Sequence, residues 1–168
     1  MYIINDADIP AIVFSHDRGG FVSKLIKLRA GIPTHAMWLI DLDVLVTQGF
    51  MSYKTIKIDK YFNNDKCDLW FFKPILTAEQ KMKLLKKIED DLSKPWYKKC
   101  YDFLGIIGHL LGIPFLQNPY KYYCIERITE TLRHVGFNVK LHLTPKQLYG
   151  YCIRNKKIIY LGKIKGGD

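Results

Sequence analysis

Alternating apolar and polar positions in the first half of the chain predict short β-strands separated by turns. The spacing of Phe21, Leu25 and Leu28 adds one short helix after the first strand, and His16 falls in the turn between them. We expect strands at residues 9–15, 34–40, 44–48, 53–58 and 69–73. This part of the chain is therefore predicted to form a small antiparallel sheet.

The second half has helical periodicity, and its clearest helix covers residues 77–92. Thr77 and Gln80 have the spacing of a capping box at its start. The apolar stripe predicted to face the core contains Met82, Leu85, Ile88 and Leu92.

Further helices are predicted at 101–111, 124–134 and 144–152, followed by a last strand at 157–161. In the helix at 124–134, the side chains of Ile125, Ile128 and Leu132 are expected to point inward, and Gly136 stands where a C-terminal glycine belongs. Thr144 and Pro145 have the cap and first-turn signature of the last helix. A sheet followed by helices and a closing strand predicts an α+β fold, with one helical layer against the sheet in a single domain over residues 1–168.

The composition agrees with a folded chain, since 48% of its 168 residues are apolar and 25% are charged. A formal charge of +10 favours an anionic partner, such as a nucleic acid, a cell-wall polymer or a membrane surface. We expect no nucleic-acid partner, because the lysines are spread over several segments and no zinc-finger, RNP-like or helix-turn-helix signature is present. The sequence gives no indication of the oligomeric state.

Targeting signals are not evident. The longest apolar candidate, 103–115, is interrupted by glycines, a histidine and a proline, so we expect no transmembrane segment. The first ten residues contain acids and no basic region before an apolar stretch, so we expect no secretory signal. We therefore expect the chain to be cytoplasmic as synthesised. A role outside the cell would require that it is carried in a phage particle or released by cell lysis.

Four cysteines stand at positions 67, 100, 124 and 152, and their spacing fits no zinc site. We expect reduced thiols, no metal and no cofactor. Cys124 differs from the others because it opens a predicted amphipathic helix, where the macrodipole and unpaired N–H groups lower the pKa of a thiol. The alternative is a buried structural cysteine.

A nucleophilic cysteine needs a base within hydrogen-bond reach. His35 is the best-placed histidine, because it lies on a predicted strand between Thr34 and Ala36 rather than in a polar loop. A histidine held on a rigid strand opposite the start of a helix can supply that base. The alternative is a structural histidine.

The order of several short segments resembles the permuted NlpC-type papain-like hydrolases, and within them the YiiX/YaeF-like group related to lecithin–retinol acyltransferase-like proteins. The segments are Asp8–Phe14, Phe21–Lys27, Gly31–Trp38, Tyr101–Gly105, Tyr122–Glu126 and Val135–Gly136. They resemble the family's opening strand, its first helix, its "(S/T)H" strand, its "YD" helix, its "YCSE" nucleophile helix and the "AG" that follows. The resemblance covers about residues 8–137.

This resemblance implies a circularly permuted papain-like fold, with a small sheet or barrel against a helical layer. It implies Cys124 as the nucleophile and His35 as the general base of an amide or ester hydrolysis that passes through an acyl-enzyme. Relatives of this kind act on peptidoglycan peptides, other amides or lipid esters. The positive charge favours an anionic wall peptide as the first substrate to test.

Two departures from the family pattern leave an alternative open. The usual acidic residue that orients the histidine falls near Val46, so the third residue is predicted to be Gln48, with Thr47 as the alternative. The family's serine after the cysteine is Ile125 here. The backbone N–H of Cys124 is a candidate oxyanion donor, with support from Tyr123 or Tyr122. The alternative function is a catalytically weak or inactive papain-like module that binds or has a structural role, such as in a phage particle.

Overall fold

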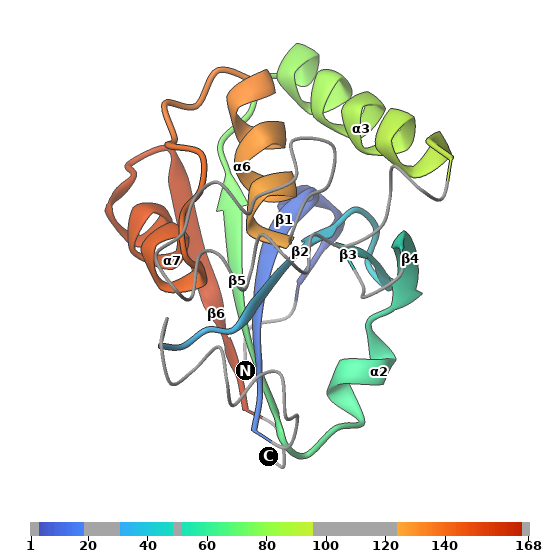
Figure 1. Ribbon diagram of the computed structural model, residues 1–168, viewed down its shortest axis with the longest axis vertical. Coiled ribbons are helices and arrows are strands. Elements are labelled where there is room, and N and C mark those ends of the chain that lie inside the picture. Colours follow the sequence, from blue (N-terminus) through green and yellow to red (C-terminus); the bar gives the residue numbers. More distant parts are fainter. Residues whose placement is uncertain (1–3, 19–30, 49–51, 96–123, 166–168) are drawn as a thin grey trace.

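A six-stranded antiparallel sheet organises the computed structural model, which describes residues 4–18, 31–48, 52–95 and 124–165 (Figure 1). Its strands are β1 (Ala11–Asp17), β2 (His35–Leu39), β3 (Val44–Gln48), β4 (Tyr53–Lys57), β5 (Cys67–Pro74) and β6 (Ile158–Ile164). They lie in the order β4-β3-β2-β1-β5-β6. Within these residues β4 and β6 are the edges, so the sheet is open and not closed into a barrel. The α+β class with helices packed on an antiparallel sheet is confirmed.

The helices follow the sheet in the chain, as predicted. They are α3 (Ala78–Ser93), α6 (Cys124–His134) and α7 (Pro145–Arg154). Two short elements were not predicted, the 3-10 helix η1 (Asp6–Asp8) and the one-turn helix α2 (Asp59–Phe62). The helices predicted at 21–28 and 101–111 lie outside the described residues.

Local signals at the helix ends agree with the sequence. Thr77 and Gln80 form the predicted capping box at the start of α3, and Thr144 and Gln147 form another at the start of α7. After α6, Gly136 has a φ of 91°, a left-handed conformation that glycine adopts without a steric penalty. These residues fix where the helices begin and end.

The sheet has buried residues on both faces, because successive side chains of β1 alternate between them. Ile12 and Phe14 belong to the helix-side core, together with residues of α3, α6 and α7. Ala11 and Val13 belong to the opposite-face core. On α6, the side chains predicted to point inward are all buried: Ile125, Ile128 and Leu132. Each such side chain contributes roughly 1.5–3 kcal/mol through removal from water, so α6 is firmly held on the sheet.

Two predictions about side-chain placement are wrong. Met82 of the predicted stripe on α3 is 66% exposed. Ile88 is buried as predicted, Leu85 and Leu92 pack against the core, and α3 also buries Leu84 and Asp91. His16 lies inside β1 rather than in a turn, is buried, and has its Nδ1 3.5 Å from the Thr34 hydroxyl.

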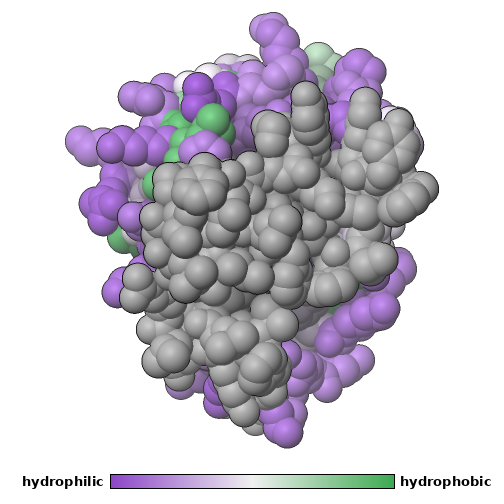
Figure 2. All heavy atoms as spheres, viewed as in Figure 1, coloured by the Kyte–Doolittle hydropathy of each residue, from purple (hydrophilic) through white to green (hydrophobic). Residues whose placement is uncertain are grey.

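The visible described surface is mostly hydrophilic, with small hydrophobic patches (Figure 2). None of the helices in the described part of the chain is long and apolar enough to cross a membrane.

Candidate active site around Cys124 and His35

His35 is the first residue of β2, and the sheet register brings it near β3. Trp38 lies opposite Val46 and Leu39 opposite Leu45. Continuing this register places Thr47 diagonally from His35 on the same face, a distance that a ring can span. In the structure, His35 Nε2 lies 2.7 Å from Thr47 Oγ1, which is a short hydrogen bond between two partly or fully buried groups.

Of the two residues predicted as the third member of the site, this geometry favours Thr47 over Gln48. Thr47 and Gln48 are neighbours on β3, so their side chains point to opposite faces of the sheet. Thr47 is 4% exposed, and its hydroxyl fixes the orientation of the His35 ring. Gln48 is also buried, opposite Tyr53 on β4.

Cys124 is the first residue of α6 and lies against His35. The two side chains are hydrogen-bonded, and the charge of Cys124 acts on the pKa of His35. Burial alone would lower the pKa of His35, but the negative charge of the Cys124 thiolate and its hydrogen bond more than offset that effect, so the pKa of His35 is raised. The arrangement therefore favours a thiolate beside an imidazolium.

The start of α6 adds a second feature to this pair. The first N–H groups of a helix have no partner within the helix, and they carry the positive end of the helix dipole. Cys124 is the first residue of α6 that the structure describes, and it is 3% exposed. A thiolate in the first turn of a helix, and an oxyanion formed next to it, are both stabilised by such groups.

The other described thiols have the opposite environment. Burial raises the pKa of Cys67 to about 11, with further contributions from Asp17 and Asp68. Burial raises the pKa of Cys152 to about 12. Both are free cysteines that remain protonated at neutral pH. Cys124 is thus distinguished by its histidine partner from two cysteines of the same chain.

Several predicted site residues lie outside the described part of the structure. These are Tyr122 and Tyr123, expected to support the oxyanion, and Cys100. Their roles stay predictions. Two surface cavities of about 330 and 400 Å³ share Ile75 and Leu76 in their linings, and neither includes Cys124, His35 or Thr47.

Sequence reasoning missed a contact at the first turn of α6. Glu126 is 4% exposed, and its Oε1 lies 2.8 Å from Nδ1 of His142 in the loop before α7. His142 has a φ of 58°, which is uncommon for a residue with a side chain. The single signal in the sequence is an acid two residues after the cysteine, and this did not identify its partner.

A metal site is not formed by the described side chains. Among residues 4–18, 31–48, 52–95 and 124–165, no group of three or more His, Cys, Asp or Glu lies close enough together to hold a metal ion.

Comparison with known proteins supports the fold. No protein-family model matches the chain, and no curated protein matches it. Among solved structures, the chain is similar to the metalloprotein yiiX from Escherichia coli O157:H7, DUF1105, with a TM-score of 0.60 and 13% sequence identity. The match covers 93% of this chain and 97% of that one. At this identity the likeness shows a shared fold, and the chemistry of the chain is argued from its own residues.

Proposed function

We propose that this chain is a cysteine hydrolase of the permuted papain-like type, in which Cys124 is the nucleophile and His35 the general base. One observation carries the proposal: the hydrogen bond between the Cys124 thiol at the start of α6 and the His35 ring on β2. The yiiX-like fold and the order of the sequence motifs support it.

The ring of His35 has two nitrogens with separate roles in this proposal. In the tautomer that this role requires, Nε2–H donates to Thr47 Oγ1, 2.7 Å away, and Nδ1 is the nitrogen available to the thiol. Nδ1 takes the proton of Cys124 Sγ, and the thiolate forms a bond to the substrate carbonyl carbon. The backbone N–H of Cys124 stabilises the resulting oxyanion.

Collapse of this intermediate breaks the carbon–nitrogen or carbon–oxygen bond. The proton held on His35 Nδ1 goes to the departing amine or alkoxide, and a thioester remains on Cys124. His35 then takes a proton from water, whose oxygen attacks the thioester carbon. The acid is released, and the proton returns to the thiolate, so the pair is ready for another cycle.

The substrate class proposed first is an amide in an anionic wall peptide. The formal charge of +10 supports an anionic substrate or surface. A lipid ester or another amide uses the same chemistry and belongs in the same screen.

The alternative function, an inactive binding module on this fold, is favoured by the neutral third residue. A hydroxyl stabilises imidazolium less than the carboxylate that is usual at this position. The low exposure of Cys124, at 3%, also favours a structural thiol.

The experiment that separates the two functions is trapping of the acyl-enzyme. The protein is mixed with p-nitrophenyl acetate, quenched in acid and analysed by peptide mass spectrometry, with Cys124→Ala as the matched control. The hydrolase predicts an acetyl group on Cys124, with a burst of nitrophenol that is absent in the control. Failure of Cys124 to acylate, or equal release by the control, would contradict the proposal.

A further inference from the structure

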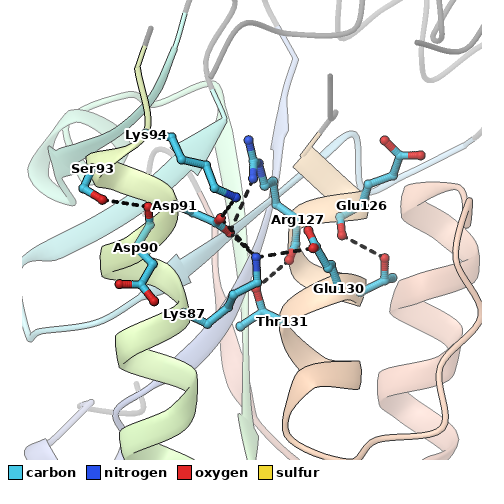
Figure 3. A network of polar contacts seen from close by, with 10 residues as sticks. Lys87, Asp90, Asp91, Ser93, Lys94, Glu126, Arg127, Glu130 and Thr131 are labelled. Carbon is cyan, nitrogen blue, oxygen red and sulfur yellow. Dashed lines mark hydrogen bonds and ion pairs between the residues drawn. The ribbon is translucent and has the colours of Figure 1, made fainter. Parts of the chain in front are cut away.

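A group of charged side chains lies between α3 and α6, with two fully buried members at its centre and more exposed members around them (Figure 3). We call it the α3–α6 ion cluster, and its members are Lys87, Asp91, Lys94, Arg127 and Glu130. At its centre, the Asp91 carboxylate is 2% exposed. Lys87 Nζ lies 2.9 and 3.0 Å from its two oxygens, and Lys94 donates to it as well. Arg127 Nη1 is 3.4 Å from Asp91 Oδ2.

The cluster connects α6 to α3 through two contacts. Besides Arg127 with Asp91, Glu130 Oε1 lies 3.3 Å from Lys87 Nζ. Arg127 is three residues after Cys124, and Glu130 three residues after that. Residues three apart are neighbours on a helix surface, so Arg127 lies between Cys124 and Glu130 along α6.

The cluster also reaches the sheet. The guanidinium carbon of Arg127 lies 5.0 Å from the centre of the Tyr53 ring, a cation–π distance. Tyr53 is buried on β4, where it pairs with Gln48, the neighbour of Thr47 on β3. Arg127 therefore contacts both α3 and the hairpin that carries the partner of His35.

Stability alone does not explain this cluster. Charges removed from water are costly, and replacement of a buried ion pair by apolar side chains of similar volume is often neutral or stabilising. Arg127 is 1% exposed, so this cost applies to its charge in full. What a charged, forked side chain adds is direction, because guanidinium–carboxylate and guanidinium–ring contacts fix its position.

We propose that Arg127 is a positioning residue: through Asp91 and Tyr53 it fixes α6 against α3 and the β3–β4 hairpin, so that the Cys124 thiol meets the His35 ring. The inference rests on the proposed function, since it assigns a role toward that pair. A thiol–imidazole hydrogen bond depends on placement to within a fraction of an ångström. Apolar packing holds a helix on a sheet, and the cluster selects its position along the sheet.

The test replaces the cluster's central pair; Lys87 keeps its contact with Glu130, and Lys94, which is 38% exposed, is left to solvent. The double variant Arg127→Met with Asp91→Leu removes one cation and one anion together. The matched control is Lys83→Met with Glu79→Leu, an exposed pair on the same helix, with side chains 57% and 71% exposed. The rate of Cys124 alkylation by iodoacetamide is measured from pH 5 to 9, together with the thermal midpoint.

A positioning role predicts that the double variant lowers the alkylation rate of Cys124 without lowering the thermal midpoint. At pH 6 the alkylation rate of Cys124 falls about tenfold, because a displaced thiol loses the stabilisation of its thiolate, and one pKa unit is a factor of ten. The thermal midpoint stays at the wild-type value or rises, and the control variant matches wild type in both measurements. An unchanged rate at pH 6 in the double variant would overturn the inference.

If circular dichroism shows that the double variant is unfolded, the single variant Arg127→Lys is measured in its place. It keeps the charge and loses the planar guanidinium group that lies over Tyr53 and beside Asp91. We expect its Cys124 rate at pH 6 to fall while its rate at pH 9 stays near wild type, and equality with wild type at both pH values would overturn the inference. Failure of the wild-type protein to show any excess reactivity of Cys124 would instead refute the proposed function.

Discussion

Replacing Thr47 with valine removes one hydroxyl and keeps the shape of the side chain. The bond lost is the one from His35 Nε2 to Thr47 Oγ1, at 2.7 Å. A neutral hydrogen bond contributes about 1 kcal/mol and a charge-assisted one about 2 kcal/mol. The imidazolium therefore loses about 1 kcal/mol more than the neutral ring, which lowers the pKa of His35 by about 0.7 units. The wild-type pKa of this histidine is raised, so the change moves it back toward its ordinary value.

The assay is an NMR titration of the His35 ring protons, assigned among the five histidines with a His35→Gln variant. Thr47→Ser keeps the hydroxyl and is expected to titrate like wild type. Thr55→Val, an exposed threonine on the neighbouring strand β4, is the matched control. A titration of Thr47→Val that coincides with wild type, or moves to higher pH, would refute the role given to this hydrogen bond.

Three other predictions concern the fold. Burial would raise the pKa of Asp91, but Lys94, Lys87 and Arg127 hold that pKa below its usual range. The ionised carboxylate therefore adds stability that is lost as pH falls through the lowered pKa. Between pH 2 and 7, the thermal midpoint of Asp91→Asn is expected to depend less on pH than that of wild type. Leu84→Ala, at a fully buried position, is expected to lower the free energy of unfolding in urea by about 2–5 kcal/mol. Met82→Ala, at a position that is 66% exposed, is expected to change this free energy by less than about 0.5 kcal/mol. Equal effects of the two variants would contradict the observed buried face of α3. Gly136→Ala places a side chain at a φ of 91° and is expected to cost about 1–2 kcal/mol in the same assay, and no loss would show that the turn adapts.

The elements were predictable because their signals are local. β3 has the predicted boundaries, Val44–Gln48, and α6 ends at the predicted residue, His134. Capping boxes depend on residues three apart, and strands on alternation of side chains, so both can be read from short windows. The one-turn helix α2 is too short to show a period.

Contacts that depend on pairing between distant segments were harder to predict. Thr47 and Gln48 lie on opposite faces of the sheet, and the hydrogen bond from Thr47 to His35 depends on the register of β2 on β3. On α3 the predicted stripe is right at Ile88, Leu85 and Leu92 and wrong at Met82. It also left out Asp91, which is buried with cationic partners, one of which, Arg127, comes from α6. An acid in a core position is read as solvent-facing from sequence alone.

The juxtaposition of Cys124 and His35 was suggested by a resemblance in motif order, not by spacing. Neither residue type nor periodicity says that a strand at 35 and a helix at 124 meet. The structure brings them into hydrogen-bonding contact, and this contact is what the proposed chemistry needs.

The measurement that tests the central proposal most directly is the rate of thiol alkylation as a function of pH, resolved by site with mass spectrometry, in wild type and His35→Ala. The account predicts that Cys124 reacts first below pH 7, with an apparent pKa well below the ordinary value of about 8.5. Cys67 and Cys152, with pKa values raised to about 11 and about 12, stay unmodified there. In His35→Ala the advantage of Cys124 is lost. Slow labelling of Cys124 in wild type, or labelling that does not change in His35→Ala, would contradict an activated Cys124–His35 pair and leave the fold as a binding scaffold.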